Sequence, residues 1–199
     1  MKVSKINFFK TVLNFSVIML LSMSSCKQSN KSTKSKSGNN PNEKSIAATP
    51  KMNLQTAVMS GNLEIIKQHI ESGTPLNTKD QMTGATPLIS AITFGKTTIV
   101  KTLIDANAEL NITNNDGATA LHVAAFFCRI ESVQMLIDAK ADKTLKNSYG
   151  QTPRESVLGL FTEVQPFYEM LQQQLGPIGV QIDLAEIEKN RPVIAMMLQ

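Results

Sequence analysis

Apolar residues recur three and four positions apart in several stretches of this chain, which is the spacing of one face of an α-helix. Three such stretches are EIIKQHI at 64–70, TIVKTLI at 98–104 and SVQMLI at 132–137. The last two each follow a shorter run of small and apolar residues, LISAI at 88–92 and LHVAA at 121–125. The pattern predicts successive helix pairs, each with a short first helix and an amphipathic second one.

The same pattern returns with a period of 33 residues. Gly84, Gly117 and Gly150 form one series, and LIDANA at 103–108 returns as LIDAKA at 136–141. A further copy lies 34 residues upstream, with one residue inserted between it and the next. A period near 33 predicts a solenoid of helical hairpins, in which at least about three units must stack to bury their apolar faces.

Two copies resemble ankyrin repeats: GATPLISAITFGKTTIVKTLIDANAELNITN at 84–114 and GATALHVAAFFCRIESVQMLIDAKADKTLKN at 117–147. The resemblance implies an all-α ankyrin-repeat solenoid of helix–turn–helix units, with β-hairpin-like turns between them. It also implies protein–protein binding without catalysis. We place the repeats within 51–153, at about 51–80, 81–113 and 114–146, with the start of a fourth from 147.

Residues 154–199 are predicted to hold the rest of a degenerate fourth repeat and C-terminal capping helices. In the fourth repeat, QPFYEMLQQQL at 165–175 is predicted to be the second helix. Asp183 is expected to cap a following helix and Pro192 to lie at the start of another, so that a pair of short helices closes the solenoid. The alternative is a Met-containing helix that binds a partner.

Particular residues are expected to begin and end the helices. Thr86 and Thr119 stand where a helix N-terminus needs a side-chain oxygen. Gly61 and Gly95 are predicted to end the first helices in a left-handed conformation. Cys128 occupies the equivalent position in the next copy, where the same conformation would cost about 1–2 kcal/mol.

Charge is distributed unevenly along the chain. Residues 1–50 hold eight lysines and one acid, a net charge of +7, whereas 51–199 hold twelve basic and fifteen acidic residues, a net charge of −3. The overall charge of +4 therefore arises in the first 50 residues. No basic face with interleaved aromatic residues is evident, so the sequence does not favour nucleic-acid binding.

The first 25 residues have the order of a secretory signal peptide: three lysines, an uncharged and mainly apolar run at 11–23, and two small residues. MSSC at 23–26 resembles a bacterial lipobox, which implies lipidation of Cys26; the alternative is an ordinary cleaved signal. Residues 26–50 are then a flexible Lys/Ser-rich tether. We expect a membrane-anchored lipoprotein of the bacterial cell envelope, in the outer membrane facing the periplasm.

His122 and Cys128 are the residues that first suggest chemistry. Six residues turn an α-helix through about 600°, so the two side chains face different ways and form no dyad. The resemblance implies that His122 hydrogen-bonds the turn of a neighbouring unit. With only two histidines, we expect no metal site, and we predict no catalytic residues, no cofactor and no small-molecule substrate. The alternatives are a redox or enzymatic role for Cys128, or a structural spacer.

The resemblance places partner binding at the hairpin tips and on the exposed side of the first helices. Phe94 and Phe127 are expected to stack one repeat apart as interface anchors. Alternatively, they pack between helices or against the fourth repeat. The full set of candidates is Met82, Thr83, Ala85, Thr93, Phe94, Asn115, Asp116, Ala118, Phe126, Phe127, Ser148, Tyr149 and Gln151.

Overall fold

The computed structural model describes residues 50–199, so the predicted signal peptide, tether and lipidated Cys26 lie outside the described residues. Within this range the regular structure is helical, with no β-strand. The first six helices form three hairpins with equal helix lengths: α2 (Leu54–Ser60) with α3 (Leu63–Glu71), α4 (Pro87–Thr93) with α5 (Thr97–Asp105), and α6 (Ala120–Phe126) with α7 (Ile130–Asp138).

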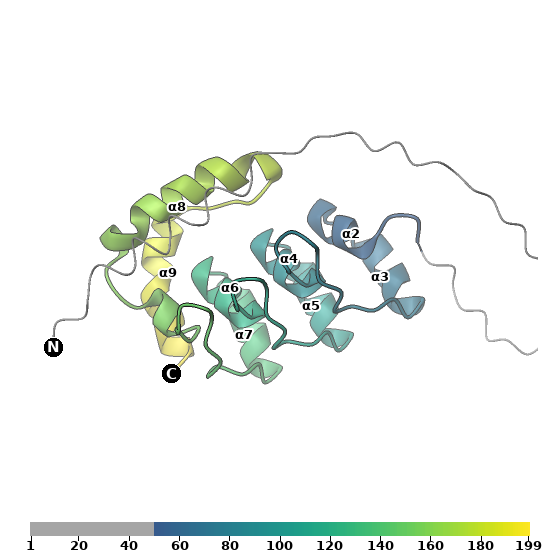
Figure 1. Ribbon diagram of the computed structural model, residues 1–199, viewed down its shortest axis with the longest axis horizontal. Helices are drawn as coiled ribbons and strands as arrows, with labels where there is room; N and C mark the ends of the chain where they lie inside the picture. The colour runs from purple at the N-terminus through teal and green to yellow at the C-terminus, as the bar shows by residue number, and fades with distance from the viewer. Residues whose placement is uncertain (1–49) are drawn as a thin grey trace, which may run out of the picture. The chain divides into compact units, whose positions relative to one another are not determined.

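The hairpins stack in sequence order and form two layers of helices (Figure 1). The first helices, α2, α4 and α6, pack side by side, and so do α3, α5 and α7. The core lies between the layers. Leu88 and Leu121 are buried there, as are Leu103 and Leu136 one helix later in each repeat. The 33-residue spacing of these leucines is therefore the spacing of one core layer.

The predicted helix ends are confirmed. The side chains of Thr86 and Thr119 accept hydrogen bonds from the third backbone N–H of α4 and α6. Gly61 and Gly95 are left-handed, and Cys128 adopts the same conformation with φ 52°. The turn after each second helix is also left-handed, at Gly73, Asn107 and Lys140.

The C-terminal region departs from the predicted fourth repeat. Its first helix is reduced to the 3-10 turn η2 (Glu155–Val157), which packs on α6. The helix that packs on α7 is α9 (Leu184–Met197), so α9 stands where the second helix of a repeat stands. The prediction that 165–175 would be this second helix is wrong. Those residues belong to α8 (Phe161–Leu175), an insertion that ends at the 3-10 turn η3 (Gly176–Ile178).

The prediction that a second short helix begins at Pro192 is also wrong, because α9 continues through this residue. Proline inside a helix costs about 3 kcal/mol. The buried residues Ile187, Arg191, Ile194 and Ala195 follow helical spacing across it. Their packing on α7 and η2 outweighs that cost, and Asp183 caps the helix as predicted.

The lengths and hydropathy of these helices bear on the membrane. None of the helices within residues 50–199 is both long enough and apolar enough to cross a lipid bilayer.

Candidate functional site

The turns that precede α4, α6 and η2 form a continuous row, which we call the tip ridge: residues 82–83, 115–116 and 148–149. Backbone hydrogen bonds join neighbouring turns. The Asn115 N–H donates to the Thr83 carbonyl and the Ser148 N–H to the Asp116 carbonyl, both at 2.9 Å. The Asn115 side-chain amide also donates to the Met82 carbonyl at 3.0 Å. These bonds fix the spacing of the tips along the solenoid.

Each tip is also held from within by one side chain at its base. Asp80 accepts hydrogen bonds from three backbone N–H groups of the first tip, at 2.8–2.9 Å. Asn114 and Asn147 accept two each in the next tips, at 2.9–3.0 Å. Such Asx turns satisfy backbone donors that a surface loop would otherwise leave to water. The ridge is a rigid part of the fold.

The candidates on the tip ridge differ in exposure. Met82 is 74% exposed and Tyr149 is 46% exposed, which leaves two large apolar side chains on this surface. Thr83, Asn115 and Ser148 are also exposed, and Asp116, Ala118 and Gln151 are half-buried. Ala85 is only 7% exposed, so its side chain belongs to the core and is not available to a partner.

Asp116 and Tyr149 influence each other across two neighbouring tips. Burial raises the pKa of the Asp116 carboxyl. Burial also raises the pKa of the Tyr149 hydroxyl, and the nearby Asp116 charge adds to this effect. The ridge thus pairs an acid with an aromatic side chain that remains a neutral hydrogen-bond donor at physiological pH.

The candidates on the first helices lie against the chain's own insertion. The Phe126 ring stacks on the Tyr168 ring of α8, with centroids 4.9 Å apart, and meets Phe167 edge-on at 5.8 Å. The Tyr168 hydroxyl donates to the Phe126 carbonyl at 2.7 Å. For Phe126 the alternative of packing against the C-terminal region therefore describes the structure. Sequence reasoning missed this role of α8, although the aromatic residues of FTEVQPFY at 161–168 were a signal for it.

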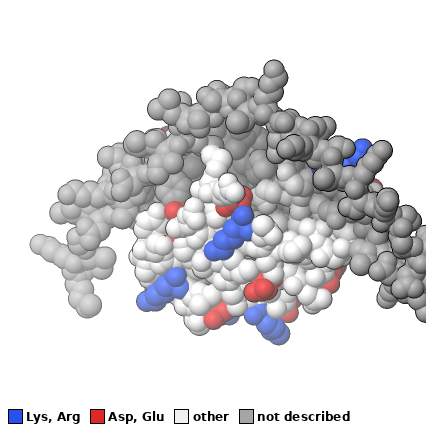
Figure 2. Space-filling model, turned by 45° about the vertical axis from the view of Figure 1, so that its right-hand side comes forward, with Lys and Arg blue, Asp and Glu red and all other residues white. Residues whose placement is uncertain are grey.

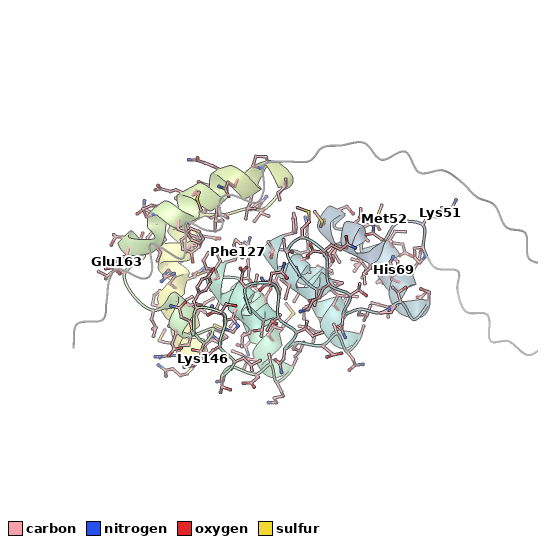
Figure 3. The ribbon with its side chains drawn as sticks, viewed as in Figure 1. Lys51, Met52, His69, Phe127, Lys146 and Glu163 are labelled. Carbon is pink, nitrogen blue, oxygen red and sulfur yellow. The ribbon has the colours of Figure 1, made fainter. Side chains whose placement is uncertain are left out.

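The predicted stack of Phe94 on Phe127 is not formed. Phe127 pairs edge-on with Phe126, its sequence neighbour, at 5.0 Å. Phe94, Phe127 and Thr93 are each half-buried, and both phenylalanines pack on the core. Figure 3 places Phe127 at the end of α6, on the side that faces α8. The insertion thus covers part of the surface that the sequence assigned to a partner.

His122 has the structural role that the resemblance implied. Its Nε2 donates to the Gln151 carbonyl in the next turn, at 2.9 Å, and its Nδ1 lies 2.8 Å from the Thr119 hydroxyl. Burial lowers the pKa of the imidazole, and the bond to Gln151 opposes that shift. His69 plays a similar part at the other end, where its Nε2 lies 2.8 Å from the Met52 carbonyl (Figure 3).

Cys128 is buried between the last hairpin and α9. Its thiol donates to the Ile187 carbonyl at 3.7 Å, and burial raises the pKa of Cys128 to about 11. A thiol with this pKa carries almost no thiolate at neutral pH, so it is a poor nucleophile. The geometry gives no support to the alternative of a redox role for this residue.

Metal-binding groups and charge were compared across residues 50–199. No group of three or more His, Cys, Asp or Glu side chains in this range could hold a metal ion. Figure 2 shows lysines, arginines and acids scattered over the visible face, without a basic patch. The site therefore consists of the tip ridge, with its apolar, polar and acidic side chains.

This geometry defines a repeat solenoid with a ridge of stacked turns, and comparison with known proteins specifies which kind. Residues 54–147 match the family model for ankyrin repeats in three copies. The solved ankyrin repeat domain of Bcl-3, described as a unique member of the IkappaB protein family, aligns with a TM-score of 0.51 and 29% identity. That alignment covers 52% of this chain and 45% of the other. Residues 54–147 thus form an ankyrin-repeat domain, and the chain is an ankyrin-repeat protein.

Two curated relatives match shorter segments. An ankyrin repeat-containing protein of Schizosaccharomyces pombe is 31% identical over 70 residues, which are 35% of this chain and 33% of the relative. Protein phosphatase 1 regulatory subunit 27 of Homo sapiens is 39% identical over 64 residues, which are 32% of this chain and 41% of the relative. The matched segments thus span about a third to two-fifths of these relatives. An ankyrin-repeat domain indicates a role in protein–protein interaction.

Proposed function

We propose that this chain is a non-catalytic binding module that scaffolds or regulates a partner protein through the tip ridge. The observation that carries the proposal is the exposure of Met82 and Tyr149 on a ridge whose backbone is held by hydrogen bonds between repeats. Exposed apolar and aromatic side chains on a rigid support are typical anchors of protein interfaces. Asn115, Asp116 and Ser148 between them supply polar groups for specificity. The relative that is a phosphatase regulatory subunit supports a regulatory role of this kind.

The test is affinity capture from cell-envelope extracts with the wild type and with a Met82→Ser/Tyr149→Ser variant. We expect the variant to lose the partner, because both apolar anchors are removed while the fold is kept. Ile178→Ser is the matched control, since Ile178 is 48% exposed but lies in η3, away from the tip ridge. Unchanged recovery of every partner by the folded double variant would contradict the proposal.

We also propose that Cys26 carries a lipid that anchors the chain in the bacterial envelope, in the outer membrane facing the periplasm. The support is the sequence order of positive residues, apolar run and MSSC at 23–26. Labelled palmitate should enter the wild type and not Cys26→Ala. Equal labelling of the two proteins would rule out Cys26 as the site of acylation.

A further inference from the structure

A pocket of about 370 Å³ lies at the C-terminal end of the solenoid, away from the tip ridge. One wall is the segment from η2 to the start of α8, and the other is the second half of α9. In Figure 3, Glu163 marks the first turn of α8, next to this segment. Three large apolar side chains at the pocket are well exposed: Leu158 at 45%, Leu160 at 67% and Met196 at 62%.

The pocket also contains a buried guanidinium group, that of Arg191. This residue is 3% exposed, and it donates hydrogen bonds to the Tyr168 hydroxyl and the Leu158 carbonyl, both at 3.3 Å. Its Nε atom is buried and has no hydrogen-bond partner among the described residues. No carboxylate of residues 50–199 forms an ion pair with it. A buried charge without a counter-ion is costly, so an anion bound here would be favoured.

Two further charged side chains line the same pocket. Arg154 donates through Nε to the Ala195 carbonyl at 3.1 Å, which orients its guanidinium group beside α9. Glu188 is exposed and forms no ion pair with a described residue. The pocket thus combines two arginines and an apolar wall with one acid, which disfavours an anionic ligand.

We propose that this pocket binds a segment of a partner protein in which an acidic side chain lies between apolar ones. The carboxylate would be the counter-ion that Arg191 and Arg154 lack, in the geometry that guanidinium groups suit best. The flanking apolar side chains would cover Leu158, Leu160 and Met196. The proposal rests on the proposed protein-binding function and adds a second contact point at the end of the solenoid.

The probe is the peptide acetyl-Leu-Glu-Leu-amide, with acetyl-Leu-Gln-Leu-amide as its neutral match. Both are titrated into the ¹⁵N-labelled full chain carrying Cys26→Ser, and amide shifts of 155–161 and 192–197 are followed by NMR. We expect the Glu peptide to shift these amides and to bind at least about tenfold more tightly than the Gln peptide. Equal affinities, or no shifts up to about 10 mM peptide, would overturn the proposal.

Variants with opposite expected effects separate binding from folding. Arg154→Gln should reduce the affinity for the Glu peptide about tenfold, because one guanidinium group is lost. Glu188→Gln should tighten it about threefold, because a like charge is removed, and should leave the Gln peptide unaffected. A misfolded protein cannot bind more tightly, so an unchanged affinity in Glu188→Gln would count against the proposal.

Arg191→Met tests the buried residue itself. Replacing a buried charge with an apolar side chain of similar size is often neutral for stability. We expect this variant to fold and to bind the Glu and Gln peptides equally. Failure of the peptide experiments would leave partner binding by the tip ridge intact, whereas loss of the Met82 and Tyr149 effect would not alter the peptide result.

Discussion

At the scale of single residues, His122 joins two repeats and is sensitive to protonation. Its Nε2 faces the Gln151 carbonyl and therefore carries the proton. Its Nδ1 accepts from the Thr119 N–H at 3.2 Å, as one half of a capping box. A proton on Nδ1 would face that donor, and the charged ring would be buried. The neutral imidazole is thus the form that the fold selects.

This arrangement predicts a loss of stability at mildly acidic pH. Because the folded pKa of His122 is below the ordinary 6.5, the unfolded chain binds the proton more readily. The stabilisation is fully present above pH 6.5 and is lost as pH falls through the folded pKa. Thermal melts between pH 8 and pH 4 should show a larger decrease for the wild type than for His122→Gln, which can still form a capping box. Parallel pH dependence of the two proteins would contradict this account of His122.

The buried thiol of Cys128 makes a second residue-scale prediction. In a Cys26→Ser background, Cys128 is the single thiol, and its pKa of about 11 compares with an ordinary value of 9.0. At pH 8 the folded protein should react with iodoacetamide at least about a hundredfold more slowly than the urea-unfolded protein, because the thiolate is rarer and buried. Similar rates in both states would show that the thiol is accessible, and a redox role would then regain support.

At the scale of elements, the stacking of the tips depends on glycine at one position and not at its repeat equivalent. Gly117 has φ +68°, and a Cβ there would lie 2.8 Å from the backbone nitrogen of Ser148 in the next tip. Gly150 has φ +74°, with nothing within 4 Å of its Cβ position. Gly117 therefore meets both a conformational and a steric restriction, whereas Gly150 meets only the first.

Substitution of the two glycines separates these effects. Gly150→Ala should lower the free energy of unfolding by about 1–2 kcal/mol, the cost of a left-handed Cβ residue. Gly117→Ala should lower it by about a further 1–3 kcal/mol, because neighbouring backbone must move. Urea denaturation of both variants measures the difference. Equal losses would mean that the tips are not in the close contact described.

The elements also show which features a sequence can predict. Helix pairs, caps and the left-handed turn at Cys128 depend on local residues and on comparison between copies, and all of these were predicted correctly. Pro192 was misread because local preference marks it as a helix start, whereas burial of Ile187 and Ile194 on either side keeps α9 continuous. The assignment of the second helix of the fourth repeat failed for a related reason, since only packing on α7 distinguishes α9 from α8.

At the scale of the whole molecule, the solenoid is regular where the sequence repeats and irregular where it does not. The tip ridge was predictable, because its residues occupy equivalent positions in successive copies. The cover of α8 over Phe126 was not, because it joins residues 42 positions apart that belong to no repeat. The pocket around Arg191 likewise combines η2, α8 and α9, whose arrangement no periodicity encodes. The binding surface nearest the C-terminus is thus specific to this chain.

The most direct test of the central claim is site-specific photo-cross-linking in cells. A benzophenone amino acid replaces Met82, or Tyr149, or Lys101 as a control. The Lys101 side chain is 66% exposed but lies on α5, away from the tip ridge. We predict that positions 82 and 149 cross-link the same protein and that position 101 does not. The same cross-links from all three positions, or from position 101 alone, would contradict recognition by the tip ridge.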